Sequence, residues 1–159
     1  MVTKGVPDPG AAVDEGRHGV GRAAALLRAC RPRQWLKNLL VLAAPAAAGA
    51  LTRPETAATC LAVFVLFCVA ASGTYLLNDA HDVHRDRAHP RKRHRPVASG
   101  DLPVPVAVTA GSVLCVAAPS ASLLLDDIAP SLLLTGYVLL TLAYTHRLKD
   151  LVVVDLVAV

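Results

Sequence analysis

The sequence predicts an all-α membrane protein in which several helices cross the bilayer and pack as a bundle. Of its 159 residues, 54% are hydrophobic and only 4% are aromatic, yet the chain carries 16 Lys and Arg and 12 Asp and Glu. The apolar residues fall in long uncharged blocks and the charges lie between them, a pattern typical of membrane spans joined by polar loops. Ala, Leu and Val supply most of the apolar length, so a water-soluble core built on large aromatic rings is not expected.

The beginning of the chain is predicted to lie outside the membrane. We expect residues 1–30 to form a disordered tail and residues 31–159 to form the membrane domain. The first 21 residues are rich in Gly, Pro and charge, and they lack the apolar core and cleavage site of a secretory signal. The four cysteines form no CxxC pair, which argues against a zinc site or a disulfide framework.

Four apolar blocks account for the predicted spans. The block at 57–77 has 21 uncharged residues, and a helix of that length extends about 31 Å, which matches the hydrocarbon thickness of roughly 30 Å. The block at 39–51 can cross only if residues 36–38 are added to it. The block at 102–125 has two prolines in its first turn, where a helix tolerates them, and the fourth block is 128–144. A fifth block, 151–159, is too short to cross, so we expect a truncated bundle of four complete spans plus the start of a fifth.

The basic residues predict the orientation of these spans. Three regions carry nearly all of the Lys and Arg, and alternate loops carry one Arg or none. The positive-inside rule then places the basic regions in the cytoplasm. We therefore expect a multi-pass protein of the plasma membrane, with a cytoplasmic N-terminus and a cytoplasmic loop over residues 78–101.

Three aspartates follow the second predicted span, at spacings that place them on one helix face. If the helix continues, Asp79, Asp82 and Asp86 lie within about 60° of one another, because successive residues turn by 100°. Carboxylates gathered in this way repel one another unless a cation lies between them. Such oxygen ligands suit Mg²⁺, whose shell is usually completed by water and by phosphate oxygens of a substrate. The cluster predicts a Mg²⁺-diphosphate site, and the alternative is a solvated helix end with local ion pairs.

A basic run follows the aspartates. Pro90 and Pro96 interrupt the helix, so the run can fold back over the carboxylate face. A guanidinium group can bind two oxygens of one phosphate at the same time, and Lys92 adds a mobile point charge. The run therefore predicts binding of a diphosphate or a sugar phosphate, while for Arg91 and Arg93 contact with an anionic leaflet stays open. Nucleic acid is not an expected partner, because the loop lacks stacking rings.

Two further groups leave alternatives open. Arg31, Arg33 and Lys37 surround Trp35 at the entrance of the first span, where both interfacial anchoring and phosphate contact are reasonable interpretations. The histidines between the aspartates could indicate a transition-metal loop. On a continuous helix, however, His81 and His84 project away from the carboxylates, which argues against that interpretation.

The ordered motifs resemble one known family. The pattern NDxxDxxxD, which begins at Asn78 after an apolar span, resembles the first aspartate-rich motif of the UbiA superfamily of intramembrane prenyltransferases. The opening RPRQWxKN, from Arg31 to Asn38, and the run DRxHPxKRxRPxASG, from Asp86 to Gly100, resemble a branch that transfers phosphoribosyl groups in cell-wall arabinan synthesis. The resemblance covers residues 31–159.

The resemblance implies transfer of 5-phosphoribosyl from phosphoribosyl diphosphate to decaprenyl phosphate or another polyprenyl phosphate in the membrane. It implies that the three aspartates hold Mg²⁺ on the leaving diphosphate, without a protein nucleophile. The remaining residues that it implicates orient a ligand or neutralise phosphate charge, and they are Lys37, Asn78, Lys92, Arg95, Tyr144 and Lys149.

Two alternatives accompany this interpretation. The first is ordinary prenyl transfer, in which the same aspartates hold a prenyl diphosphate and an aromatic or other acceptor attacks it. The second is a noncatalytic membrane fragment. Family members have about nine spans and a second polar motif in a later loop, so we expect the 159-residue chain alone to be inactive or very weak.

Overall fold

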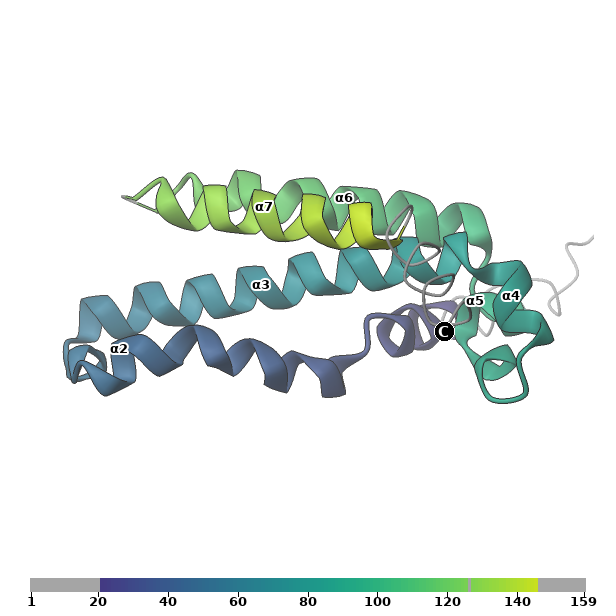
Figure 1. The fold of residues 1–159 in the computed structure, drawn as a ribbon, viewed down its shortest axis with the longest axis horizontal. Helices are drawn as coiled ribbons and strands as arrows, with labels where there is room; N and C mark the ends of the chain where they lie inside the picture. The colour runs from purple at the N-terminus through teal and green to yellow at the C-terminus, as the bar shows by residue number, and fades with distance from the viewer. Residues whose placement is uncertain (1–20, 126, 146–159) are drawn as a thin grey trace, which may run out of the picture.

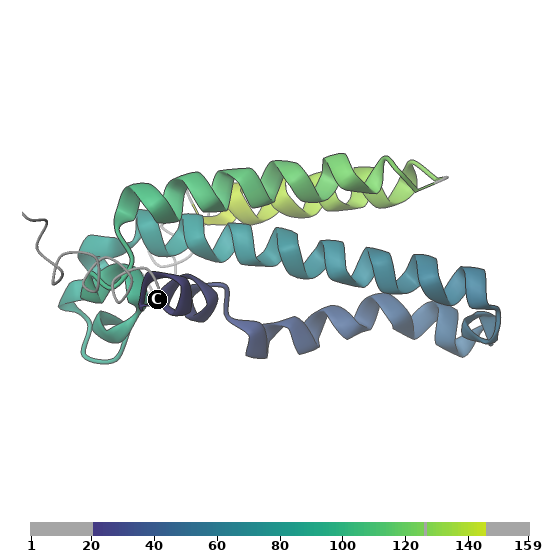
Figure 2. The same cartoon turned by 180° about the vertical axis from the view of Figure 1, so that it is seen from behind.

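Long helical segments run side by side along the length of the molecule (Figures 1 and 2). The computed structural model describes residues 21–125 and 127–145, and these residues form helices and turns without a strand. The bundle consists of a first segment, η1 (Pro32–Leu42) with α2 (Ala43–Ala47), followed by α3 (Pro54–His81), α6 (Val104–Ser122) and α7 (Ala129–Ala143). Helices α3 and α6 are long and apolar enough to cross a membrane, and α7 is a shorter apolar helix. The predicted helical membrane fold is confirmed.

Short elements close the two ends of the bundle. At one end lie α4 (Val83–Ala88), η3 (Lys92–His94) and α5 (Pro96–Ser99), beside a helical stretch over residues 21–29 (Figure 1). At the other end, η2 (Ala50–Thr52) joins the first segment to α3, and a turn at 123–124 follows α6 before the chain enters α7. The chain therefore alternates direction as predicted, and the basic loop shares one end with the helix at 21–29. We call this end the polar end.

The first segment is wound differently from the single α-helix that its apolar block suggests. Residues 32–42 form a 3₁₀ helix of 11 residues, and α2 adds five more. A 3₁₀ helix rises about 2 Å per residue, so the two helices together extend about 30 Å. Pro45 lies within α2 and supplies no backbone N–H, which disfavours a continuous α-helix there. The 3₁₀ winding lets a short apolar block extend about as far as the hydrocarbon layer is thick.

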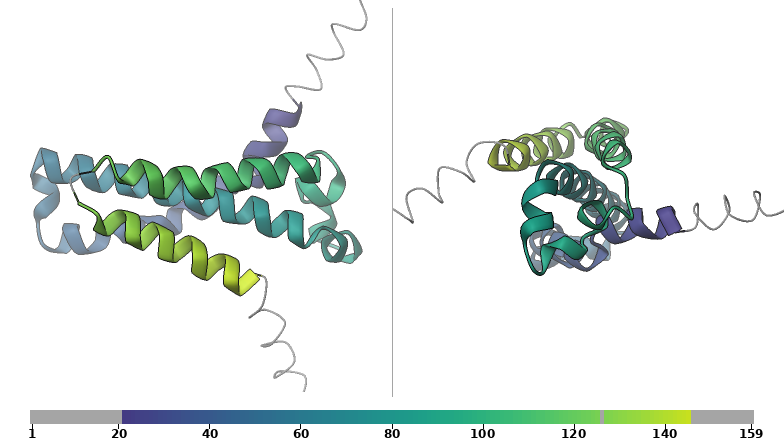
Figure 3. Two further views of the ribbon diagram at one scale, coloured as in Figure 1. Left: turned by 90° about the horizontal axis from the view of Figure 1, so that it is seen from above. Right: turned by 90° about the vertical axis from the view of Figure 1, so that its right-hand side faces the viewer.

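Helix α3 occupies the centre of the bundle and contacts the first segment, α6 and α7. The right-hand panel of Figure 3 views the bundle from one end and shows α6 and α7 on one side of α3 and the first segment on the other. The contact with α6 is closest at Gly73 and Gly111, where an added Cβ on either glycine would meet the other residue's carbonyl oxygen at 2.8 to 3.0 Å. Small residues at such crossings allow membrane helices to approach backbone to backbone.

Two apolar clusters hold these helices together. The first lies at the polar end and includes the fully buried Leu76 and Ala107, and the second joins the middle of α3 to α6 and α7 through Leu134. Many large apolar side chains on the outer faces remain exposed, with Leu40 at 79% and Leu140 at 67%. Because lipid tails solvate such side chains, these outer faces fit a bilayer and not water.

The N-terminal boundary of the ordered part differs from the expected one. We expected disorder through residue 30, but residues 21–29 are helical, with Ala25 and Ala29 buried in the cluster at the polar end. These two alanines are four residues apart and lie on one helix face, where their small side chains allow close packing. The first 20 residues, and the fifth apolar block at 151–159, lie outside the described residues.

Candidate functional site

The three aspartates lie where α3 ends and α4 begins. Helix α3 ends at His81, Asp82 lies between the two helices, and α4 starts at Val83. The helix is therefore not continuous, but the Asp82 N–H still donates to the Asn78 carbonyl and the Asp86 N–H to the Asp82 carbonyl. These bonds keep the α-helical spacing across the break.

All three aspartates are buried, which is unusual for carboxylates. Asp79 is 2% exposed, Asp82 is 4% and Asp86 is 2%. In contrast, His81 and His84 are exposed, as expected for side chains that project away from the carboxylates. Buried charges are stable only with partners of opposite charge or with a metal ion.

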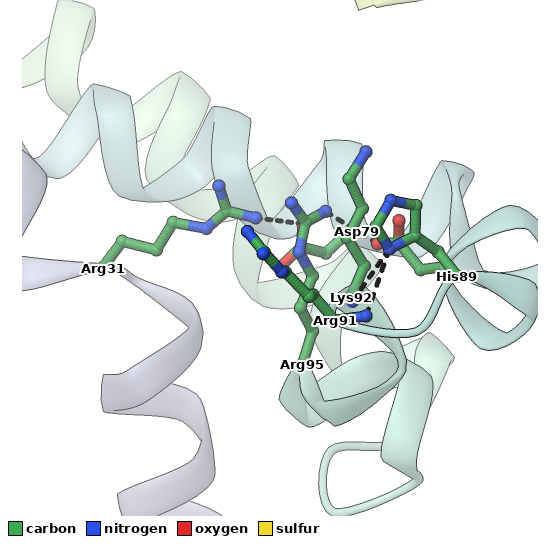
Figure 4. Close-up of polar contacts among 7 residues, drawn as sticks. Arg31, Asp79, His89, Arg91, Lys92 and Arg95 are labelled. Atoms are coloured by element: carbon green, nitrogen blue, oxygen red, sulfur yellow. Dashed lines mark hydrogen bonds and ion pairs between the residues drawn. The ribbon is translucent and has the colours of Figure 1, made fainter.

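Arg95 provides one such partner and bridges two of the carboxylates. Its Nη1 atom donates to Oδ1 of Asp79 at 3.1 Å and to Oδ2 of Asp86 at 2.7 Å (Figure 4). Arg95 lies between η3 and α5, immediately before Pro96, with an extended backbone. The basic run therefore does fold back onto the acidic face, as the prolines predict.

Arg31 approaches Asp79 from the other direction. Its Nη2 atom lies 2.5 Å from Oδ1 of Asp79 (Figure 4). Its guanidinium also lies 5.0 Å from the ring centroid of Tyr75. The backbone of Arg31 has φ of 53°, a left-handed conformation that non-glycine residues rarely adopt. This conformation joins the helix at 21–29 to η1, and it positions the guanidinium over the end of α3.

One oxygen of this cluster has no partner within the described part of the chain. Oδ2 of Asp79 is buried and accepts no hydrogen bond there. A buried carboxylate oxygen left without a donor costs free energy, so its position fits a ligand that supplies positive charge.

The donor set fits a magnesium-type ion that phosphate completes. Within the described residues, no three His, Cys, Asp or Glu side chains gather closely enough to hold an ion by themselves. Mg²⁺, however, is commonly bound by one or two carboxylates together with water and substrate phosphates. Asp79 and Asp86 share one Arg95 nitrogen and so lie close enough for that mode, with Oδ2 of Asp79 available.

The loop that carries Arg95 is held by local hydrogen bonds. Nδ1 of His89 accepts from the backbone N–H groups of Arg91 and Lys92, at 3.2 and 3.4 Å. Across the loop, Nε of Arg87 donates to the Ala98 carbonyl at 3.1 Å. His89 and Arg87 therefore shape the turn that returns the chain to the carboxylates.

An apolar groove lies next to the acidic cluster, along the part of α3 that precedes Asp79. Its volume is about 320 Å³, and it lies between the helix at 21–29, η1 and α3. Ser72 in its wall accepts a hydrogen bond from the Trp35 indole at 3.1 Å and donates to the Cys68 carbonyl at 2.8 Å. Ser72 and Asp79 are seven residues apart on α3, so the groove and the carboxylates share one face of that helix.

Cys30 forms part of the same wall, outside the membrane-spanning segments. Burial raises the pKa of its thiol above the ordinary value, and a hydrogen bond with Ser72 partly opposes that rise. Cys30 is therefore mostly a neutral thiol at pH 7, which suits an apolar lining.

The remaining predicted site residues make no such contacts with the aspartates, or lie outside the described part of the chain. Asn78 is half-buried beside Asp79, whereas Lys37 and Lys92 are exposed, and neither lysine side chain contacts the carboxylates in the described structure. Tyr144 directly follows α7, as its C-cap residue, and is 52% exposed. Lys149 lies outside the described residues.

Arg31 is the cluster member that sequence reasoning assigned least firmly, because anchoring and phosphate contact looked equally reasonable. Its partner Asp79 is 48 residues away. The only local signal was the Arg-Pro pair ahead of a span, which does not reveal a left-handed backbone.

The comparisons with known proteins agree with this geometry. The chain matches the UbiA prenyltransferase family over residues 39–159 and belongs to that family. Proteins of this family generally use a divalent metal ion.

Three relatives are named decaprenyl-phosphate phosphoribosyltransferase. The relative from Corynebacterium glutamicum is 41% identical over 140 residues, covering 86% of this chain and 42% of the relative. The relative from Mycolicibacterium smegmatis is 44% identical, covering 84% of this chain and 43% of the relative. The relative from Mycobacterium tuberculosis strain H37Rv is 43% identical, covering 86% of this chain and 46% of the relative. The chain therefore spans less than half the length of these relatives.

Proposed function

We propose that this chain forms the diphosphate-binding side of an intramembrane phosphoribosyltransferase. The reaction moves 5-phosphoribosyl from phosphoribosyl diphosphate to decaprenyl phosphate or a similar polyprenyl phosphate. The observation that carries the proposal is the buried carboxylate pair Asp79 and Asp86 at the polar end of a membrane helix. Two guanidinium groups contact the pair, and one of its oxygens has no partner among the described residues. The names of relatives 41 to 44% identical support this choice of substrates.

The acidic side of the site would hold the metal ion. Asp79 and Asp86, with Asp82 beside them, are the residues that would bind Mg²⁺, and Asn78 would orient a ligand of the ion. When bound, Mg²⁺ offsets the negative charge that develops on the departing diphosphate. Burial of the carboxylates strengthens their attraction for a cation, because little water screens it.

The basic side of the site would bind phosphate. Arg95 and Arg31 already lie at the carboxylates. Lys92, in the same loop as Arg95, and Lys37, in η1, are proposed to add their charges when the phosphates bind. As the C1–O bond of the ribose breaks, the diphosphate leaves with the electron pair, and these cations stabilise its charge. A lipid phosphate oxygen attacks C1, so no protein side chain acts as nucleophile. Tyr144 and Lys149 are proposed to contact the same phosphates.

The membrane supplies the acceptor. The apolar groove lined by Trp35, Cys30 and Ser72 lies on the same face of α3 as Asp79 and is suited to isoprenoid units. A lipid lying there would have its phosphate at the level of the acidic cluster. We propose that this end faces the cytoplasm and that the protein resides in the plasma membrane, as the basic loop favours.

The test is transfer of ribose label from phosphoribosyl diphosphate into polyprenyl phosphate, by membranes that contain this chain or a full-length relative. Asp79→Asn, made in the chain and at the matched position of the relative, should abolish Mg²⁺-dependent labelling. Asp101→Asn removes an exposed carboxylate and should leave labelling unchanged. Labelling from a prenyl diphosphate into an aromatic acceptor, with none from phosphoribosyl diphosphate, would instead establish prenyl transfer.

A further inference from the structure

Arg95 occupies the place between the carboxylates that a divalent ion would take. A single nitrogen, Nη1, lies 3.1 Å from Oδ1 of Asp79 and 2.7 Å from Oδ2 of Asp86. A metal ion bound by both carboxylates would lie against this guanidinium, and like charges at such short distance repel strongly in a buried site. Arg95 and the ion therefore cannot both bridge the pair.

The charges of the cluster support the same conclusion. Arg31 and Arg95 balance the two carboxylates that they contact, Asp79 and Asp86, and the buried Asp82 leaves the cluster with at most one further negative charge. Addition of a divalent ion leaves the group with an excess of positive charge, which a diphosphate offsets. A cation and a diphosphate should consequently bind together much more tightly than the cation alone.

The two arginines differ in how firmly they are held. Arg31 is fixed by its left-handed backbone, by the helix junction and by the ring of Tyr75. Arg95 lies in a short loop between η3 and α5, and a single nitrogen makes both of its contacts with the carboxylates, so rotation about its side-chain bonds can carry the guanidinium away from Asp86. Arg95 is thus the arginine that a divalent ion can displace from the carboxylates.

We infer that Arg95 is an exchangeable counter-ion of Asp79 and Asp86. Without a divalent ion its guanidinium bridges the two carboxylates and keeps them together. When the ion and the diphosphate bind, Arg95 leaves Asp86 and pairs with the diphosphate, while Arg31 stays on Asp79. This inference rests on the proposed function and adds to it a positioning role: Arg95 couples binding of the ion to binding of the diphosphate.

The test measures Mn²⁺ binding to the full chain in lipid nanodiscs by equilibrium dialysis, with and without inorganic diphosphate. Arg95→Gln removes the competing charge and should bind Mn²⁺ alone about tenfold more tightly than the unchanged chain. Diphosphate should then raise its Mn²⁺ affinity less than it does for the unchanged chain. Arg93→Gln is the matched control, because the side chain of this exposed arginine of the same loop bonds only to His94 among the described residues. The Mn²⁺ affinity of this variant should change by less than about twofold.

Circular dichroism checks that each variant keeps its helical content. If Arg95→Gln unfolds, Arg95→Lys serves in its place, since it keeps the charge but its shorter side chain and strongly hydrated ammonium reach the two carboxylates less well than Nη1 of Arg95 does. It should bind Mn²⁺ alone more tightly than the unchanged chain does, by a smaller factor than Gln. An affinity equal to that of the unchanged chain would contradict the inference.

The remaining outcomes separate the two proposals. Unchanged or weaker Mn²⁺ binding by Arg95→Gln, together with loss of diphosphate binding, would make Arg95 a fixed phosphate ligand; that result overturns the exchange and leaves the proposed function in place. Failure of the unchanged chain to bind Mn²⁺ even with diphosphate would overturn both.

Discussion

Gly73 on α3 and Gly111 on α6 pack against each other so closely that neither has room for a side chain. A Cβ on Gly73 would lie 2.8 Å from the Gly111 carbonyl oxygen, and a Cβ on Gly111 would lie 3.0 Å from that of Gly73. Side chains add to the obstacle, with Cys115 Sγ 2.8 Å from a Cβ on Gly73 and Leu77 Cγ 2.9 Å from a Cβ on Gly111, but the backbone oxygens can move only if the helices separate. This contact fixes the distance between the helix that carries the acidic cluster and its largest neighbour.

The first prediction concerns this crossing. Gly111→Ala should destabilise the bundle by about 1–3 kcal/mol, because the added methyl group overpacks a filled interface. Unfolding by SDS in mixed micelles measures the change. Gly136→Ala on α7 is the control, since nothing lies within 4 Å of its added Cβ; it should be neutral or stabilise by up to about 1 kcal/mol. Equal effects of the two substitutions would refute the close crossing.

A second prediction concerns the buried ion pairs. Asp79→Asn removes the charge that both Arg31 and Arg95 contact, and it should lower the free energy of unfolding by about 1.5–3 kcal/mol in the absence of metal. Asp101→Asn breaks an ion pair whose side chains are 65% and 52% exposed, so its cost should stay below about 1 kcal/mol. Thermal unfolding in detergent compares the two, and the argument fails if Asp101→Asn costs as much.

A third prediction concerns the bond between the first segment and α3. Trp35 is the only tryptophan of the chain, so its fluorescence reports directly on its contact with Ser72. Ser72→Ala should change the emission of Trp35 and destabilise the bundle by about 0.6–1.5 kcal/mol, as buried hydrogen bonds between membrane helices do. Thr59→Ala is the control. It removes an exposed hydroxyl that donates to the Glu55 carbonyl within α3, and it should leave the emission of Trp35 unchanged. A shift in both variants would contradict the assignment.

A fourth prediction concerns Cys30 and pH. Because burial raises the pKa of this thiol, its thiolate fraction at pH 7 is smaller than that of an exposed cysteine, and maleimide should modify it more slowly. The rate should keep rising as the pH approaches the raised pKa, beyond the range in which an exposed thiol has levelled off. The measurement uses a chain in which the other three cysteines are replaced by Ala.

The control for this measurement is Ser99→Cys in a chain without other cysteines, at an exposed position of α5. Polyprenyl phosphate should slow the labelling of Cys30, which lines the groove, and leave the control unaffected. Equal protection at both positions would show that the lipid does not select the groove.

The long apolar helices could be predicted because their signals are local. An uncharged block as long as the hydrocarbon predicts α3. Similarly, the prolines at 103 and 105 mark the beginning of α6, since proline is favoured at the start of a helix, where its missing N–H costs nothing. The pairing of the basic run with the carboxylates followed from the interrupting prolines and opposite charge.

Other features depend on contacts between distant parts of the chain. The 3₁₀ winding of the first segment accompanies hydrogen bonds to α3 from Trp35 and Asn38, across 37 and 30 residues. The ion pair of Arg31 with Asp79 requires a left-handed residue at a helix junction. Neither the winding nor the conformation has a sequence signature, because each reflects the packing that surrounds it.

The length of α3 bears on how the proposed reaction should be measured. Its 28 residues extend about 42 Å, well beyond a hydrocarbon layer of roughly 30 Å, so Asp79 near its end lies at headgroup depth. A water-soluble donor such as phosphoribosyl diphosphate can reach this depth without entering the hydrocarbon layer. The polyprenyl phosphate acceptor is a lipid and diffuses only within the plane of the bilayer. The turnover rate should therefore follow the mole fraction of polyprenyl phosphate in the bilayer, and dilution of the vesicles at constant composition should leave the rate per enzyme unchanged.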